Sequence, residues 1–183
     1  MIDGKVAFTG GVNLADEYIN QEERFGHWKD TAVMVKGQAV KSFTLMFLQM
    51  WNLTEQEVKW DECKVEASAE SDGYVMPYCD CPLDGERVGE SVYMDILYRA
   101  KHYVHIMTPY LILDNELETA LKYAAQRGVD VKIILPGIPD KKIAYSLAKS
   151  HYAQLVKYGV KIYEYDPASF TPRSSFQTMK KLW

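Results

Sequence analysis

Residues 103–137, YVHIMTPYLILDNELETALKYAAQRGVDVKIILPG, decide the fold class of this chain. The stretch begins with strand formers, passes through a segment of helical periodicity at 116–127, and returns to strand formers at 129–135. Asp114 or Asn115 can cap the helix, and Gly128 is predicted to end it as the glycine after its C-terminus. A strand, a helix and a strand with short joints predict a right-handed crossover within a parallel sheet.

The same alternation continues on both sides of this stretch. A helix is predicted at 88–101, a second helix runs from Asp140, which can cap it, to Tyr158, and a strand follows at 160–165. Residues 74–167 are therefore predicted to form an α/β unit with a parallel sheet.

The first part of the chain indicates a piece of another such unit. Strands are predicted at 5–9 and 31–36, and a helix at 38–51. One face of this helix carries an apolar stripe that is predicted to be core: Val40, Phe43, Phe47, Met50 and Trp51. Residues 1–53 would then be one domain piece, joined to the next by an acidic linker at 54–73.

Composition narrows the class of protein. The 183 residues are 48% hydrophobic and 25% charged, with a net charge of −4, which is typical of a globular chain and not of a nucleic-acid binder. No apolar run approaches the roughly 18 residues of a membrane-spanning helix. Cys63, Cys79 and Cys81 have spacings that favour free thiols over disulfides or a zinc site.

Local motifs assign no chemistry. The four histidines are His27, His102, His105 and His151. None stands in a recognisable triad spacing, and the sequence has no G-x-S-x-G, P-loop or H-E-x-x-H. His151 falls among apolar helix residues and is interpreted as a core histidine that is hydrogen-bonded there.

One longer pattern carries a resemblance. Asp3 is followed after six residues by Gly10-Gly11-Val12-Asn13. This resembles the end of the phospholipase D superfamily signature, H-x-K-x4-D-x6-G-G-x-N. The strings DGKVAFTGGVNLADEYIN, TPYLILD and RGVDVKIILPGIPDK are similar to bacterial cardiolipin synthases, and the resemblance extends over 1–167.

The resemblance implies both a fold and an activity. The fold would be α/β and phospholipase-D-like, with mixed or parallel sheets flanked by helices, here as two incomplete halves. The activity would condense two phosphatidylglycerols to cardiolipin and glycerol through a phosphohistidine, without metal or other cofactor. Asp3 would be the catalytic aspartate of the first motif, supported by Gly10, Gly11 and Asn13.

The stretches that resemble the family do not contain the H-x-K pairs of its signature. The single H-x-K of the sequence, His27-Trp28-Lys29, has Met34 where the signature has aspartate, and is interpreted as coincidental. The tail 168–183 is aberrant, but codons permitted for it can encode FIHAKVFVSDDEKAV one frame over, which predicts a frameshift. We therefore expect an inactive internal fragment of an enzyme of the cell membrane, itself cytoplasmic or peripheral.

Other interpretations remain open at this point. The chain could derive from a phospholipase-D-type hydrolase, or be a non-catalytic α/β module. Thr108, Pro109 and Tyr110 follow a strand at its carboxyl end, where parallel sheets bind ligands, so they are candidates for a substrate cleft. The partners expected of the intact enzyme are phosphatidylglycerol and a membrane surface, not nucleic acid.

Overall fold

Two compact units make up the chain in the computed structural model. Residues Met1–Leu14 and Lys29–Gly89 form the first, and Ala15–Trp28 with Glu90–Trp183 form the second. The segment 15–28 thus groups with the second unit, although the first unit lies on both sides of it in sequence. The structure describes residues 1–53, 69–70, 73–81, 85–166 and 179–182. Most of the predicted linker and of the predicted aberrant tail lies outside these residues, so both remain predictions.

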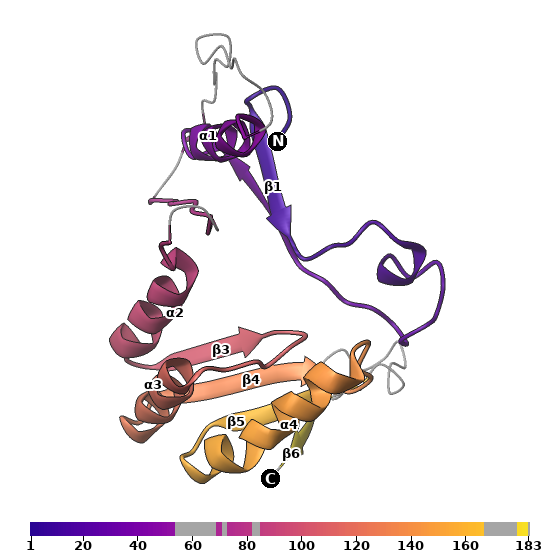
Figure 1. Ribbon diagram of the computed structural model, residues 1–183, viewed down its shortest axis with the longest axis vertical. Coiled ribbons are helices and arrows are strands. Elements are labelled where there is room, and N and C mark those ends of the chain that lie inside the picture. The colour runs from indigo at the N-terminus through magenta and orange to yellow at the C-terminus, as the bar shows by residue number, and fades with distance from the viewer. Residues whose placement is uncertain (54–68, 71–72, 82–84, 167–178, 183) are drawn as a thin grey trace. The chain divides into compact units, whose positions relative to one another are not determined.

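The first unit is built from a hairpin and a helix. Strands β1 (Val6–Gly10) and β2 (Ala32–Lys36) pair antiparallel along their full lengths (Figure 1). A turn at Gly37, whose φ of 93° suits glycine, leads into helix α1 (Val40–Trp51). The small core of the unit consists of Ala7, Val35 and Val40. All three elements were predicted from the sequence within two residues.

The predicted core face of α1 is only partly correct: Val40 is buried and Phe43 packs against the core, but Phe47, Met50 and Trp51 are exposed. This helix buries Val40, Thr44 and Leu48, whereas Phe47 and Trp51 are each 50% exposed. Their rings stack on one another with centroids 5.7 Å apart. Apolar side chains surround most of this helix, so its periodicity could not select the face that packs against the hairpin.

A four-stranded mixed sheet forms the second unit. Its order is β3 (Tyr103–Met107), β4 (Asp130–Pro136), β5 (Lys161–Tyr165) and β6 (Met179–Leu182). The first three strands are parallel and β6 runs antiparallel to β5. The predicted α/β class with mixed and parallel sheets flanked by helices is confirmed. The short strand β6 was not predicted, because the tail gave no strand pattern.

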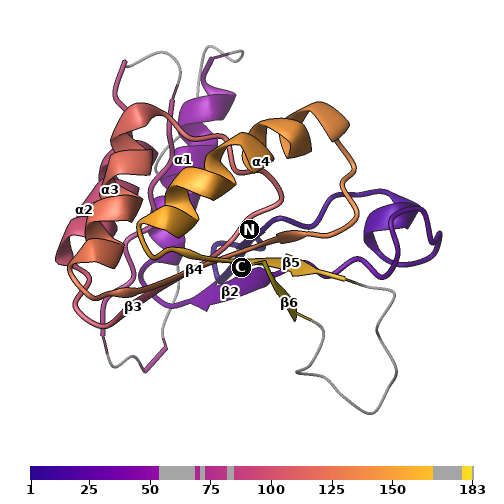
Figure 2. The same cartoon turned by 90° about the horizontal axis from the view of Figure 1, so that it is seen from below.

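Helices cover one face of this sheet, as Figure 2 shows. They are α2 (Val88–Arg99), α3 (Asn115–Gln126) and α4 (Lys142–Lys157). Alternate residues of the strands point into the core beneath them, as the pleat requires. The buried side chains of that core include Leu97, Val104, Leu121, Val131, Ile133, Leu135, Leu155 and Ile162.

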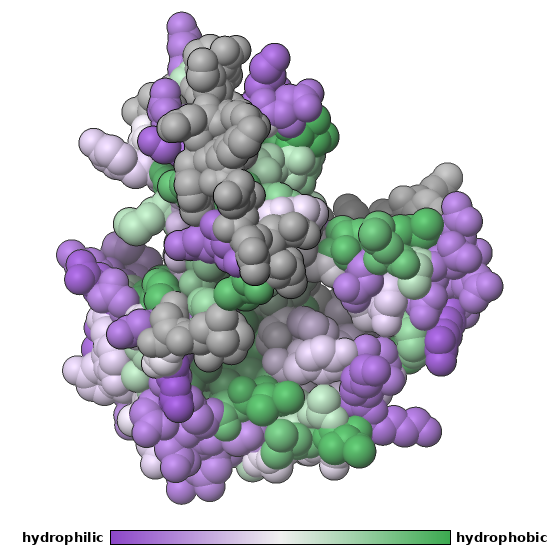
Figure 3. Space-filling model, turned by 45° about the horizontal axis from the view of Figure 1, so that its top comes forward, coloured by the Kyte–Doolittle hydropathy of each residue, from purple (hydrophilic) through white to green (hydrophobic). Residues whose placement is uncertain are grey.

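The other residues of the pleat point to the opposite face, which carries exposed apolar side chains. Tyr103 and Met107 of β3 are 67% and 64% exposed. Hydrophobic side chains, in green, are visible at the surface of the described residues in Figure 3. Strands of a parallel sheet are usually covered on both faces, so this exposure is unusual.

The helix ends test three sequence predictions. The Asp114 carboxylate accepts a hydrogen bond from Leu117 N at 2.8 Å, which confirms it as the cap of α3. Gly128 follows that helix with a φ of 88°, as predicted for a C-terminal glycine. The prediction that Asp140 caps α4 is wrong: the helix begins at Lys142, and its cap residue Lys141 makes no side-chain capping bond.

Candidate functional site

The carboxyl ends of the parallel strands meet at one edge of the second unit. Thr108 continues the β3–β4 ladder, since its N–H donates to the Ile134 carbonyl at 3.1 Å. Gly137 likewise continues the β4–β5 ladder by donating to the Tyr165 carbonyl at 2.7 Å. A Cβ on Gly137 would lie 2.6 Å from that same oxygen, so only glycine fits. The loops after β3 and β4 therefore leave the sheet side by side.

Tyr110 and Asp140 connect these two loops. The Tyr110 hydroxyl donates a hydrogen bond to Asp140 Oδ2 at 2.5 Å, joining residues 30 positions apart. This bond, then burial, raises the pKa of Tyr110 to about 12. The phenol therefore stays protonated at neutral pH and can act as neither nucleophile nor base. The pair offers oxygen atoms that can accept hydrogen bonds from a polar ligand.

Thr108 shapes the turn that presents Tyr110. Its hydroxyl donates to the Tyr110 carbonyl at 2.8 Å and accepts from the Tyr110 N–H at 3.3 Å. Pro109 lies between the two residues in the same turn. The structure thus brings together all three residues proposed from the sequence as cleft candidates. Tyr110, 36% exposed, is the one that reaches another element.

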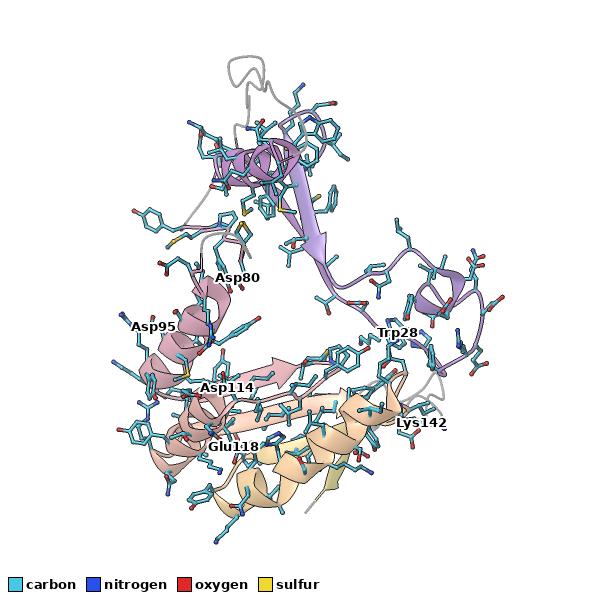
Figure 4. All side chains as sticks on the ribbon, in the orientation of Figure 1. Trp28, Asp80, Asp95, Asp114, Glu118 and Lys142 are labelled. Carbon is cyan, nitrogen blue, oxygen red and sulfur yellow. The ribbon has the colours of Figure 1, made fainter. Side chains whose placement is uncertain are left out.

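An aromatic loop, defined as residues 15–28, belongs to the same unit. Asn20 closes it by two bonds to Trp28, donating to the carbonyl at 2.8 Å and accepting from the N–H at 2.6 Å. The Trp28 ring meets Tyr18 edge-on at 4.8 Å and Phe25 at 5.9 Å. Tyr18 also contributes to the raised pKa of Tyr110 through its charge, so the loop lies near the carboxyl edge. Figure 4 labels Trp28 of the aromatic loop and Lys142, the first residue of α4.

The residues that resemble part of the first motif lie in the first unit. Asp3 and Gly4 occupy a tight turn with φ of 48° and 63°, closed by Lys5 N donating to the Ile2 carbonyl at 2.9 Å. The five residues of β1, about 17 Å at the usual strand rise, separate this turn from Gly11 and beyond. The structure therefore does not bring Asp3 together with Gly10, Gly11 and Asn13.

The histidines occupy different environments. His27 lies in the aromatic loop and not on a helix or strand. Lys132, then Lys161, bind the Asp130 carboxylate and hold the pKa of Asp130 far below its usual range. His105 Nε2 adds a weaker contact, 3.5 Å from Asp130 Oδ2. This cluster lies at the start of β4, away from the carboxyl edge.

His151 forms a contact between helices. Its Nδ1 is 2.7 Å from Glu118 Oε2, and its side chain is 17% exposed. His151 is hydrogen-bonded, as predicted, but it is partly exposed and is not part of the core cluster. Its predicted neighbours Ile143 and Leu147 are 88% and 43% exposed. Over the described residues, no group of three or more His, Cys, Asp or Glu side chains could hold a metal ion.

Comparison with known proteins identifies the family. The profile described as "Cardiolipin synthase, PLD-like domain" matches residues 93–179. The cardiolipin synthase of Alkalihalophilus pseudofirmus is 36% identical over 169 residues, covering 91% of this chain and 34% of that protein. The cardiolipin synthase of Geobacillus thermodenitrificans is 37% identical over 172 residues, covering 91% and 34%.

This chain belongs to the cardiolipin synthase family.

An uncharacterized protein of Streptococcus mutans is also similar, at 62% identity over 169 residues, covering 91% of this chain and 37% of that protein. The chain thus spans about a third of the length of the relatives that it matches. None of the helices within the described ranges is both long enough and apolar enough to span a bilayer.

Sequence reasoning missed two parts of this family member's carboxyl edge. The sequence predicts Asp140 as a helix cap, and it predicts no helix, strand or contact for the aromatic loop. The Tyr110–Asp140 bond spans 30 residues, so no local pattern could predict it. The Asn20–Trp28 closure had a weak signal in the Asn and Gly residues of the loop, which tolerate the positive φ found at Asn20 and Gly26.

Proposed function

We propose that this chain is the central part of a phosphatidyltransferase that condenses two phosphatidylglycerols to cardiolipin and glycerol. The observation that carries the proposal is the continuous similarity to cardiolipin synthases over 91% of the chain. The carboxyl edge adds a physical reason, because ligands bind outside the carboxyl ends of parallel strands. The substrate is a membrane lipid, so the intact enzyme would act at a membrane surface.

The proposed chemistry proceeds in two displacements. A histidine attacks the phosphorus of one phosphatidylglycerol and releases glycerol, leaving a phosphohistidine. The primary hydroxyl of a second phosphatidylglycerol then attacks the same phosphorus and frees the histidine. Splitting the reaction in this way replaces one difficult step with two easier ones. Lysines of the H-x-K pairs would neutralise charge on the phosphate oxygens.

We propose further that the chain is inactive by itself. Its single H-x-K, His27-Trp28-Lys29, lies in the aromatic loop and lacks the aspartate at the signature spacing. The phenol of Tyr110 cannot replace a histidine, because its pKa of about 12 keeps it protonated. The purified chain should therefore form no cardiolipin from phosphatidylglycerol vesicles.

A chimera tests the proposal directly. Residues 1–167 would replace the matching stretch of the Alkalihalophilus pseudofirmus cardiolipin synthase, which supplies the rest of the protein. We expect the purified chimera to form cardiolipin from phosphatidylglycerol, and the same protein with that stretch deleted to form none. A folded chimera without product, or one that releases phosphatidic acid and no cardiolipin, would contradict the transferase and, in the second case, favour the hydrolase.

The proposed frameshift has a separate test. Sequencing the nucleotides around codon 168 should reveal that one added base restores H-x-K-x4-D after Pro167. The chain with the restored frame should then align with cardiolipin synthases beyond residue 179, where the family match now ends. If no single-base change in that region restores the motif, the frameshift is wrong and the tail belongs to the protein.

A further inference from the structure

The Asp140 carboxylate binds a partner that the sequence does not predict. From the sequence, this carboxylate is predicted to bind the free N–H groups in the first turn of the helix that follows. Here the carboxylate instead reaches Tyr110 in the neighbouring loop, and α4 starts without a side-chain cap. Among the described residues, Tyr110 is the only side chain that donates a hydrogen bond to Asp140. The carboxylate therefore binds a neighbouring loop at the carboxyl edge and not the helix that follows it.

The Tyr110–Asp140 bond leaves two acceptors next to each other. Tyr110 uses its single proton in this bond, so its phenol oxygen retains lone pairs that can accept. Asp140 has a second carboxylate oxygen, Oδ1, with the same capacity. Both side chains are partly open to solvent, since Tyr110 is 36% exposed and Asp140 is half-buried. Two neighbouring acceptors match a ligand that offers two neighbouring donors.

The surrounding charge favours an anionic ligand with hydroxyl groups. Lys141 and Lys142 follow Asp140 directly and are both exposed. Their charges attract a phosphate and oppose a quaternary ammonium, which a carboxylate beside aromatic rings could otherwise bind. The aromatic loop, with Tyr18 close to Tyr110, adds apolar surface on which the C–H groups of a polyol can pack.

We propose that Tyr110 and Asp140 bind the vicinal hydroxyls of the glycerol headgroup of phosphatidylglycerol and so determine the specificity of the site. The proposal rests on the proposed function, and it adds which residues select the headgroup. The headgroup diol donates one hydroxyl to the Tyr110 oxygen and the other to Asp140. Phosphatidic acid, which has no headgroup alcohol, and phosphatidylcholine, which has no hydroxyl, leave both acceptors unpaired and are rejected for that reason.

Binding to the full chain tests the proposal. Short-chain phosphatidylglycerol, below its micelle concentration, would be titrated into the 183-residue chain by calorimetry, beside short-chain phosphatidic acid and phosphatidylcholine. We expect phosphatidylglycerol to bind most tightly. Asp140→Asn and Tyr110→Phe should each weaken phosphatidylglycerol binding about tenfold and leave phosphatidic acid binding unchanged, since a hydrogen bond to a charged group is lost or left unmatched.

Matched variants control for unspecific effects. Asp95→Asn removes an exposed carboxylate of α2, and Tyr123→Phe removes an exposed hydroxyl of α3. Both should bind phosphatidylglycerol as the natural chain does. Asp140 does not cap α4, so Asp140→Asn should keep the natural circular dichroism spectrum.

Several results would overturn the proposal. One is equal affinity of the natural chain for phosphatidylglycerol and phosphatidic acid, and another is an equal loss of affinity for both lipids in the variants. Tighter binding of phosphatidylcholine, or no lipid binding by the folded chain, would also overturn it. A titration with glycerol 1-phosphate separates the lipid from a soluble source of the same diol. If glycerol phosphate binds and short-chain phosphatidylglycerol does not displace it, the site takes a soluble polyol phosphate and the assignment to the lipid fails.

The outcome can be separated from that of the proposed function. An active chimera together with a chain that shows no diol selectivity would refute only this inference. Diol selectivity in the chain together with a folded chimera that forms no cardiolipin would refute only the transferase.

Discussion

Asp3 combines a predicted catalytic role with a restricted backbone. Its φ of 48° lies in the left-handed region, which aspartate, asparagine and glycine tolerate and larger side chains do not. Asp3 is exposed at the tip of a turn. Two roles can therefore be separated by experiment, one that depends on the carboxylate charge and one that depends only on the turn.

Substitution of Asp3 in the chimera distinguishes these roles. If the carboxylate orients a motif histidine and stabilises its charge, Asp3→Asn keeps the turn but should lower kcat by about a hundredfold, the lower end of the effect of one preorganised group. Asp3→Leu should in addition lower the melting temperature, because leucine is strained at this φ. Natural kcat in Asp3→Asn would assign Asp3 to the turn alone.

Glu118 connects α3 with α4 through a charge that depends on pH. Bonds from Lys122, then from His151, hold the pKa of Glu118 below its ordinary value. The unfolded chain therefore takes up the proton first as the pH falls. The stabilisation by Glu118 is present above the ordinary glutamate pKa of about 4.3 and is lost as the pH drops through the lower pKa of the folded state.

Replacement of Glu118 should reveal this dependence. At pH 7, Glu118→Gln should lower the free energy of unfolding by about 1–2 kcal/mol, because two bonds to a carboxylate are weakened. The difference from the natural chain should shrink as urea unfolding is repeated toward pH 3. Glu116→Gln, at an exposed position of the same helix, is the control and should change little. A difference that stays constant with pH would show that Glu118 acts through packing.

Among the elements, the β1–β2 hairpin depends on one close approach of two backbones. A Cβ on Gly10 would lie 2.5 Å from the Thr31 carbonyl oxygen, and 2.7 Å from Ala32 Cα. A Cβ on Gly11 would meet the end of the Asp30 side chain, at 2.6 Å. Backbone atoms in a paired ladder cannot move aside, whereas a side chain can rotate. The two glycines of the motif are therefore required to different degrees.

Alanine at each glycine tests this difference. Gly10→Ala should destabilise the hairpin by about 1–3 kcal/mol, the usual range for overpacking. Gly11→Ala should destabilise the hairpin clearly less than Gly10→Ala does. Hydrogen exchange of the β1 and β2 amides measures both, with faster exchange expected for the first variant. Equal protection in the two variants would mean that the strands can separate locally without cost.

Helix α2 is held at its end by Arg127, the residue that follows α3. Its guanidinium donates to the carbonyls of Tyr98 and Leu97, each at 2.7 Å, and to that of Ala100 at 3.3 Å. These carbonyls belong to the last turn of α2 or follow it, where no intrahelical N–H is available. Arg127 thus joins two helices that cover the same face of the sheet.

Loss of this arginine should loosen α2 more than the sheet. Arg127→Ala should speed hydrogen exchange in α2 by an amount equivalent to about 1–2 kcal/mol, because several charge-assisted bonds are lost at a partly exposed site. Arg99→Ala is the matched control, since its bond to Asp95 lies at the surface, with the two side chains 80% and 58% exposed. If both variants exchange alike, the contribution of Arg127 is only that of a surface charge.

At the scale of the whole molecule, the exposed apolar surface predicts self-association. Strand β3 stands at the edge of the sheet, and its Tyr103 and Met107 are largely exposed. An edge strand with exposed apolar side chains offers a template for pairing with another chain. The two-stranded sheet of the first unit adds little independent stability.

Sedimentation over a range of concentrations measures this association. The natural chain should form larger species as its concentration rises, and Met107→Lys should shift that rise to higher concentration by placing a charge on the edge strand. Ile143→Lys is the control, because Ile143 is 88% exposed but lies on helix α4. A monomer at all concentrations with a sharp, reversible two-state melt would contradict the prediction.

The sequence by itself determined the elements and the family. Periodicity and end signals predicted β3, α3 and β4 almost to the residue, because the Asp114 cap, the helical spacing and Gly128 are local features. The motif strings predicted membership of the cardiolipin synthase family, and the comparisons confirm it.

Only the tertiary structure decided which surfaces and side chains come together. It selected Val40, Thr44 and Leu48 as the buried side of α1, since apolar residues lie on more than one side of this helix and only packing against the hairpin chooses among them. It also showed that Asp140 accepts a hydrogen bond from Tyr110, 30 residues away in the sequence, and does not cap a helix. Such contacts depend on how strands and loops align in the sheet, and this alignment is fixed by packing over long separations that no local pattern records.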